Sequence, residues 1–223
     1  MSDVILHKIT KNVVYIYYEG GSAEKDIDLI VEKTNKVLED FSTIIKIREE
    51  MVINYHLLET KQQYKMVVVD NQKIRSFALL LDVYQLYSSG GGIAHKEILA
   101  ALSCDFGTSK SKLLINGLIN LFLKPSSHIS NEVYVSNLLR NGKFISIEEL
   151  SDNRWFKDND EIHNVIAGAF VGFLIKKYGL NSFKKIYINE TLSNKEALEE
   201  ELDLTINDID RQFVRYLAHS VLV

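Results

Sequence analysis

A histidine, a lysine and a glutamate stand together in residues 90–99, which read GGGIAHKEIL. Imidazole can act as an acid, a base or a metal ligand, and a lysine beside a carboxylate adds further acid–base capacity. His95, Lys96 and Glu97 are therefore the candidate catalytic residues if the protein is an enzyme. The three preceding glycines lack the spacing of a phosphate-binding loop, so we interpret them as a flexible entry to a helix.

Other residues with reactive side chains give weaker signals. Cys104 follows His95 by nine residues, about 13 Å along a continuous helix, which is too far for a cysteine–histidine pair. We expect this single cysteine to be buried and inert. His128 and His163 share no metal-ligand spacing, and His163 is expected to be exposed or to make a capping contact near Asn159 and Asp160.

The N-terminal third predicts a small mixed sheet with one packed helix. Residues 1–12 alternate polar and apolar side chains, which indicates a strand and not a signal peptide, and residues 13–18 are β-branched and aromatic. Apolar residues recur at three- and four-residue steps from 23 to 41, which predicts an amphipathic helix capped by Ser22. Further strands are expected at 44–47, 51–55 and 64–69, the last ending in a turn at Asp70 and Asn71.

The rest of the chain predicts helices. Gly168 and Gly172 lie one helical turn apart and allow a neighbouring element to approach closely, and Thr205 with Asp208 resembles a capping box. The fold class is therefore α+β, with a sheet-plus-helix part at 1–92 and a helical part at 93–223 in one continuous structural unit. The helices are expected at 73–87, 93–102, 110–123, 131–140, 160–178, 181–188, 195–202 and 205–218.

Composition excludes several classes of function. The net charge is −4 and the lysines are scattered, so nucleic acid is not an expected partner. The sequence contains no stretch of about 18 uninterrupted apolar residues, so we expect no membrane span. A single cysteine suits a reducing compartment, and we expect a cytoplasmic protein.

A mixed sheet, a helix that opens with a histidine and a second helix about twenty residues later resemble the gluzincin (peptidase MA-like) metallopeptidases. In that family the first helix carries His-Glu-x-x-His and the second a glutamate; the two histidines and the distant glutamate bind Zn²⁺, and the first glutamate activates water. Residues 167–180, AGAFVGFLIKKYGL, are similar to the phrase that follows the metal site, and residues 196–216 are similar to the closing helices.

The sequence departs from that family at the positions that do the chemistry. His95 matches the first ligand, but Lys96 replaces the general base, Leu99 the second histidine and Asn116 the glutamate ligand. One imidazole and one amide are a poor ligand set, and an ammonium group would repel the metal. Glu97 lies about 100 degrees around the helix from Lys96 and cannot take over its role. We therefore expect no metal and no cofactor, and His95 partly buried with a hydrogen-bond partner.

The resemblance implies a pseudopeptidase that binds a peptide or small molecule without zinc in the inherited cleft. The alternative is a metal-independent enzyme in which His95, Lys96 and Glu97 converge and act on a peptide-like or biosynthetic intermediate. A third class, a structural partner-binding protein, would expose an apolar patch elsewhere. An open cleft favours ligand binding, and a cleft filled by apolar side chains favours a structural role. The residues expected to line the cleft are Gly91, Gly92, His95, Leu99, Asn116 and His163.

Overall fold

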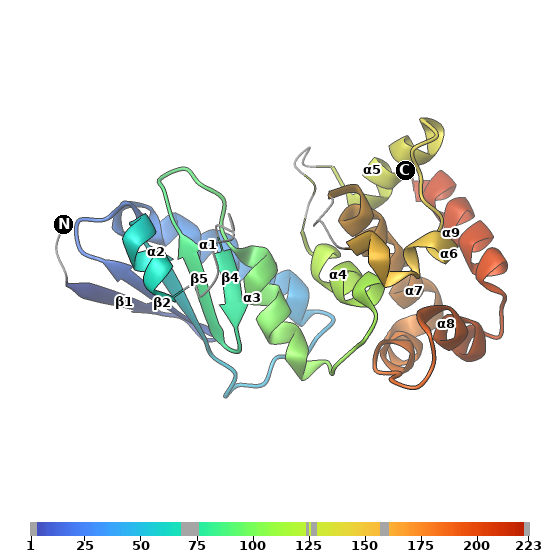
Figure 1. Cartoon of the computed structure of the whole chain (residues 1–223), viewed down its shortest axis with the longest axis horizontal. Helices are drawn as coiled ribbons and strands as arrows, with labels where there is room; N and C mark the ends of the chain where they lie inside the picture. The colour runs from blue at the N-terminus through green and yellow to red at the C-terminus, as the bar shows by residue number, and fades with distance from the viewer. Residues whose placement is uncertain (1–3, 68–75, 124, 126–128, 157–160, 221–223) are drawn as a thin grey trace. The chain divides into compact units, whose positions relative to one another are not determined.

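The chain forms two compact units, Met1–Phe106 and Gly107–Val223. The computed structural model describes residues 4–67, 76–123, 125, 129–156 and 161–220. Figure 1 shows a sheet with helices in the first unit and helices in the second, so the fold is α+β as predicted. The boundary expected after residue 92 lies instead after Phe106, because helix α3 (His95–Leu102) packs against strands of the first unit.

The sheet of the first unit is mixed, with strand order β1-β2-β3-β5-β4. The two outer pairs, β1–β2 and β4–β5, are antiparallel, and the two inner pairs, β2–β3 and β3–β5, are parallel. Alternate side chains of the central strands, such as Tyr15, Tyr55 and Val83, are fully buried and form the core of this unit. The strands are β1 (Ile5–Ile9), β2 (Val13–Tyr18), β3 (Ile53–Leu58), β4 (Ser76–Leu79) and β5 (Asp82–Leu86).

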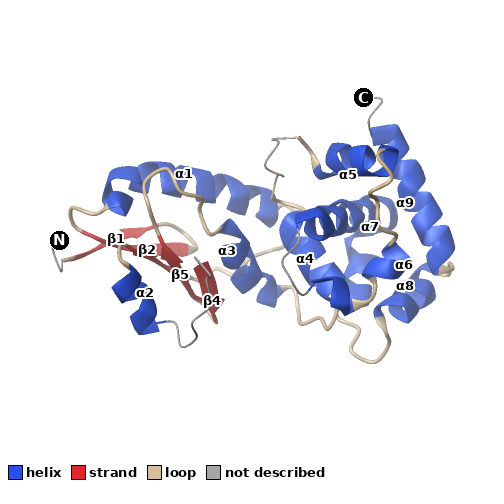
Figure 2. Cartoon of the chain, turned by 45° about the horizontal axis from the view of Figure 1, so that its top comes forward, coloured by secondary structure: helices blue, strands red, loops and turns tan. Residues whose placement is uncertain are grey.

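Two helices lie on opposite sides of this sheet, α1 (Ser22–Ser42) and α2 (Lys61–Val67), as Figure 2 shows. The apolar period predicted α1 correctly, and its buried face includes Ile27, Ile30 and Phe41. The predicted capping by Ser22 is wrong, since the N-cap is Gly21 and makes no side-chain hydrogen bond. The carboxylate of Glu59, which follows β3, instead accepts a hydrogen bond from the backbone N–H of Ala23 at 3.0 Å.

Three local predictions in the first unit are wrong. Residues 64–67 of the strand expected at 64–69 belong to helix α2, and the last two lie outside the described residues. The start of α2 is fixed because Thr60 Oγ1 accepts from the backbone N–H of Gln63 and Gln63 Oε1 accepts from that of Thr60. Within the helix expected at 73–87, residues 76–86 form the β4–β5 hairpin, which pairs with β3, and residues 73–75 lie outside the described residues. Residues 44–47 form no strand, although Ile45 is buried. The turn expected at Asp70 and Asn71 lies outside the described residues.

The second unit is built around helix α7 (Glu161–Tyr187), whose aromatic residues Phe170 and Phe173 contact Phe213. Its backbone kinks at Gly179, where φ is 86°, so the two expected helices meet there as one bent element. The capping contact at Thr205 forms, because Thr205 Oγ1 accepts from the backbone N–H of Asp208 at 3.2 Å. The other elements are α4 (Lys112–Asn120), α5 (Asn131–Arg140), α6 (Ile147–Leu150), η2 (Asn153–Phe156), α8 (Asn194–Leu202) and α9 (Ile206–Ser220).

Helices α4 and α7 approach closely where glycines face each other's backbone. A Cβ atom on Gly117 would lie 2.4 Å from Val171 Cγ2, and one on Gly168 would lie 2.9 Å from the carbonyl oxygen of Asn120. The predicted packing role is thereby confirmed for Gly168, the first glycine of the pair in α7. Over the part of the chain that the structure describes, no helix combines the length and apolar character needed to cross a bilayer.

Candidate functional site

The start of α3 is held by two side chains from the central strands. The backbone N–H of Ala94 donates both to Tyr55 Oη at 3.1 Å and to Gln85 Oε1 at 3.0 Å. Gln85 Nε2 donates to the carbonyl oxygen of Gly92 at 2.5 Å, and the Tyr55 hydroxyl donates to Gln85 Oε1. Burial raises the pKa of Tyr55, so its hydroxyl keeps its proton and the network stays intact at neutral pH. Strands β3 and β5 thus fix the position of α3.

The glycine loop before α3 is anchored on its other side as well. Gly90 has a φ of +72°, and a Cβ atom on Gly91 would lie 2.7 Å from the carbonyl oxygen of Ser88, so both positions favour glycine. Ser89 Oγ and the Tyr87 hydroxyl donate to Asp26 Oδ2 on α1 at 2.8 and 3.0 Å. These two hydrogen bonds lower the pKa of Asp26. The loop expected to be a flexible entry is therefore a hydrogen-bonded turn.

The imidazole of His95 faces α1. Its Nε2 atom lies 3.4 Å from Oγ1 of Thr34, a residue with no exposed surface. Burial and the nearby charge of Lys33 lower the pKa of His95 from 6.5 to about 4. His95 is therefore a neutral, partly buried side chain with a polar neighbour, as expected, and it is not poised to exchange a proton near pH 7.

Glu97 points to a different element. Its Oε1 atom accepts a hydrogen bond from Ser76 Oγ, at the start of β4, at 2.9 Å. Burial lowers the pKa of Lys96, and the carboxylate of Glu97 partly offsets this effect. His95 contacts α1 and Glu97 contacts β4, so these two side chains do not converge on one point as the acid–base alternative requires.

The remaining expected cleft residues have other contacts. Leu99 has no exposed surface and lies in the core beneath α3. In the second unit, Asn116 Nδ2 donates to the carbonyl oxygen of Lys112 on its own helix at 2.8 Å. His163, expected to be exposed or capping, packs edge-on against Trp155 with ring centroids 5.3 Å apart. The six expected cleft residues thus divide between the two units, with Gly91, Gly92, His95 and Leu99 in the first and Asn116 and His163 in the second.

The residues at the metal positions of the resembled family do not fit zinc. Leu99 offers no donor atom and Asn116 offers a neutral amide, which is a poor zinc ligand. Among the residues described, no group of three His, Cys, Asp or Glu side chains is arranged to hold a metal ion. His128, Asn159 and Asp160 lie outside the described residues.

The lone cysteine is exposed, so the expectation that it is buried is wrong. Helix α3 ends at Leu102 and passes into the 3-10 turn η1 (Ser103–Asp105), which brings Cys104 to the surface. Asp105, not Cys104, turns inward: its carboxylate is nearly buried and accepts from Nε of Arg48 at 2.6 Å.

The free edge of β4 lies beside α3. Strand β4 is the last of the sheet, and no other strand in the described ranges pairs with its outer side. Leu79 and Leu80 at its end are 63% and 87% exposed, so apolar surface adjoins this edge. The Ser76–Glu97 hydrogen bond connects the beginning of the strand to the first turn of α3.

Each unit has a surface pocket in its described part, and His95 lines neither of these two pockets. One, in the first unit, lies between α1 and the loops at residues 10–12 and 43–49. The other is a groove between α7 and α9 in the second unit, lined by cations and aromatic rings, which the sequence analysis missed. The pair Lys176–Lys177 and the four-residue step from Arg215 to His219 are the signals that could have indicated it.

The fold and site define an α+β protein. In its first unit, helix α3 is hydrogen-bonded beside the edge strand β4, and its helical second unit has a groove lined by cations. No protein-family model matches this chain, and comparison with curated proteins gives no match either.

Proposed function

We propose that the protein is a non-catalytic, gluzincin-like pseudopeptidase that holds an extended peptide against the outer edge of β4, beside α3. The observation that carries this proposal is the position of β4 at the end of the sheet with α3 hydrogen-bonded to its first residue. Backbone N–H and C=O groups on the open side of an edge strand can pair with an added strand.

The register of the hairpin indicates which groups would pair with the peptide. Leu80 and Leu81 form a two-residue turn between the paired residues Leu79 and Asp82. The two residues of such a closing pair exchange backbone hydrogen bonds, and hydrogen-bonded and non-hydrogen-bonded pairs alternate along an antiparallel ladder. The next pair, Ala78 with Val83, is therefore not hydrogen-bonded, and the N–H and C=O of Ala78 face the outer side of β4. Ala78 and Leu79 are exposed and would contact the side chains of the peptide.

The resemblance to the gluzincins supports the same place. In active members of that family, a strand shortly before the motif helix runs beside the cleft and holds the substrate backbone. Strand β4 lies in that part of the sequence and next to α3. The lowered pKa of His95 and the separate contacts of His95 and Glu97 favour binding without catalysis.

The test uses octapeptides selected from a random library against the whole chain, with affinities measured by fluorescence anisotropy. Ala78→Pro removes one outward N–H and should weaken binding by about tenfold, because a lost main-chain hydrogen bond costs about 1 kcal/mol and the proline ring adds a steric cost. His7→Pro is the matched control, because His7 holds a corresponding position on β1, the other edge strand. Equal affinity of Ala78→Pro and the wild type would contradict the proposal, provided that circular dichroism shows both variants folded.

Mass spectrometry of the same peptides tests the absence of catalysis. The peptides should stay intact during incubation with the protein, with and without added zinc chloride. Cleavage that disappears in the variant His95→Gln would refute the non-catalytic proposal and favour an enzyme that uses His95.

A further inference from the structure

A groove of about 690 Å³ runs between α7 and α9, entirely within the second unit. This volume lies in the range of sites for small organic ligands. We propose that the groove binds a small organic anion, with a phosphate or carboxylate group attached to an aromatic body. The inference is independent of the proposed peptide site, because all its residues belong to the second unit.

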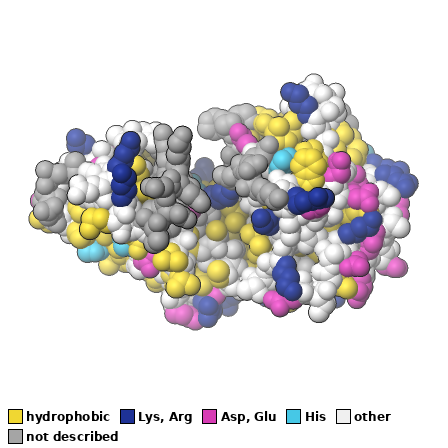
Figure 3. Space-filling view, in the orientation of Figure 1, with side chains coloured by type: hydrophobic (Ala, Val, Ile, Leu, Met, Phe, Trp, Pro, Cys, Tyr) yellow, Lys and Arg dark blue, Asp and Glu magenta, His cyan; other side chains and the backbone are white. Residues whose placement is uncertain are grey.

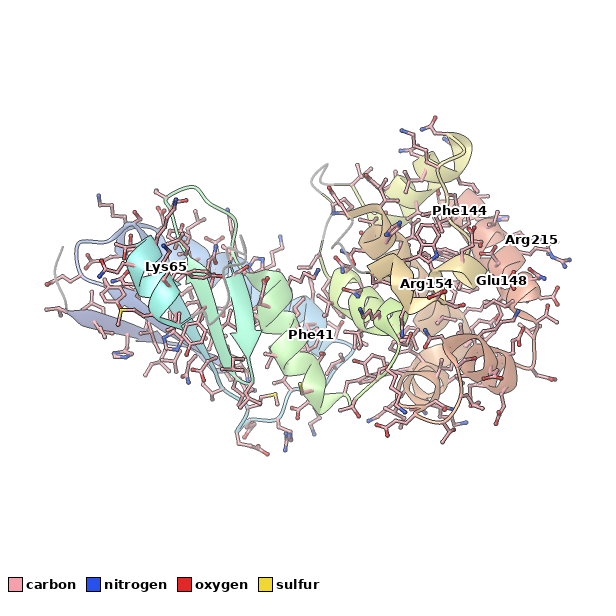
Figure 4. All side chains as sticks on the ribbon, viewed as in Figure 1. Phe41, Lys65, Phe144, Glu148, Arg154 and Arg215 are labelled. Atoms are coloured by element: carbon pink, nitrogen blue, oxygen red, sulfur yellow. The ribbon has the colours of Figure 1, made fainter. Side chains whose placement is uncertain are left out.

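Cations line the groove from both helices. Lys176 and Lys177 come from α7, and Arg215 and His219 come from α9, one helical turn apart. Figure 4 shows Arg215 extending away from the body of α9, and Figure 3 shows Lys and Arg side chains interspersed with Asp and Glu on the surface of the second unit. Within the described ranges, none of Lys176, Lys177 and Arg215 forms an ion pair with a carboxylate. Lys177 Nζ donates a hydrogen bond to Gln212 Oε1, a neutral group, so over these residues no carboxylate neutralises the three charges.

The histidine of the groove has a defined orientation. His219 Nδ1 lies 2.7 Å from the carbonyl oxygen of Arg215, which can only accept, so Nδ1 carries the proton. Nε2 is then the ring nitrogen left for a ligand, as an acceptor in the neutral form and a donor in the protonated form. The carboxylate of Glu132 accepts from the Tyr216 hydroxyl at 3.5 Å, which places an acidic group next to the aromatic side of the groove.

Aromatic rings form the rest of the groove and hold the lysines in place. Lys176 Nζ lies 5.4 Å from the ring centroid of Tyr216, and Lys177 Nζ lies 5.6 Å from that of Phe173. The two ring centroids are 5.4 Å apart. Phe173 is buried, so the partly exposed ring of Tyr216 is the aromatic surface beside the cations that a flat apolar body can contact.

The groove favours a small anion over a nucleic acid. Arginine matches the geometry of phosphate or carboxylate with two parallel hydrogen bonds, and the lysines add point charges. The cationic groups span only about one helical turn on each helix, and the whole chain has a net charge of −4. A long phosphate backbone would lack further positive contacts along its length.

The test is an NMR titration of the whole ¹⁵N-labelled chain with defined probes. Phenyl phosphate and AMP carry both the anion and the aromatic body, whereas inorganic phosphate and adenosine each carry one of them. Phenyl phosphate or AMP should shift the amide signals of α9 around Arg215, with a Kd at least tenfold lower than for either partial probe. Comparison of phenyl phosphate with benzoate then distinguishes a phosphate ligand from a carboxylate ligand.

Two variants make the result specific to the groove. Lys176→Gln combined with Arg215→Gln should weaken binding of phenyl phosphate and AMP at least tenfold. The matched control combines Arg140→Gln and Lys143→Gln, two exposed basic residues of the same unit that do not line the groove, and should leave the Kd unchanged. The proposal is overturned if no α9 signal shifts with any anionic aromatic probe, or if both double variants bind as well as the wild type. The fluorescence of Trp155 checks that each variant remains folded.

Discussion

Acidification should destabilise the first unit through His95. The pKa of His95 is about 4 in the folded chain and 6.5 when the chain is unfolded, so the unfolded state binds the proton first as the pH falls. The contribution of neutral His95 to the free energy of unfolding is complete above about pH 6.5 and declines from there to about pH 4. At pH 5 the two pKa values correspond to a loss of about 2 kcal/mol of this free energy, and below pH 4 the loss reaches about 3 kcal/mol.

The assay is urea unfolding at pH 7.5 and pH 5, followed by NMR signals of the central strands, for the wild type and for His95→Gln. Glutamine keeps a polar group near Thr34 but does not titrate, so changes at other groups cancel in the comparison. Between pH 7.5 and pH 5, the free energy of unfolding of the first unit should fall by about 2 kcal/mol more in the wild type than in the variant. The fluorescence of Trp155, the only tryptophan, reports unfolding of the second unit. By this signal the wild type and the variant should have equal free energies of unfolding at each pH. Equal losses in the first unit, or a His95 ring that titrates near pH 6.5 in the folded protein, would refute the reasoning.

Three further perturbations have defined outcomes. Gly117→Ala should lower the free energy of unfolding by about 2–3 kcal/mol, because its Cβ would lie 2.4 Å from Val171. Gly172→Ala should lower it by less than about 1 kcal/mol, because its new Cβ would approach the end of the Leu121 side chain at 3.0 Å. Equal midpoints of urea unfolding for the two variants would contradict this. Leu80→Gly should stabilise the first unit by about 1 kcal/mol, because Leu80 has a φ of 56°, and a lower midpoint by NMR would contradict the strain. A chelator should leave the Tm within about 1 °C, since a structural metal would contribute to folding, and a clear drop by calorimetry would indicate one.

Long periodic helices could be predicted from the sequence, and short apolar segments could not. The apolar steps of α1 and the polar boundaries of α5 are local signals, and α5 has the expected bounds of residues 131–140. The run SFALLLDVYQL in residues 76–86 fits a buried helix or a hairpin equally well, and its pairing with β3 decides the outcome. The start of α2 did carry a local signal, the capping pair Thr60 and Gln63, which outweighs the β-branched residues that follow.

The candidate site shows the same limit at the level of side chains. The sequence indicates that α3 opens with three titratable residues, but the partner of His95 is Thr34, sixty-one positions earlier. In the groove of the second unit, the spacing of Lys176, Lys177, Arg215 and His219 is visible in the sequence. That the two helices present these cations to one another depends on how α7 and α9 pack around the rings of Phe173 and Phe213, which no local pattern specifies.

The geometry of the first turn of α3 fits the proposed peptide binding better than acid–base catalysis. An acid and a base that act in one reaction must both reach the bound substrate, yet His95 and Glu97 lie about 200 degrees apart around the helix. Only unwinding of this turn could bring them together, and the hydrogen bonds of Tyr55 and Gln85 to Ala94 oppose it. The same hydrogen bonds keep α3 fixed beside β4. A preorganised strand edge gains affinity because little freedom is lost when a peptide binds, so the feature that prevents convergence of the reactive groups also favours the proposed binding.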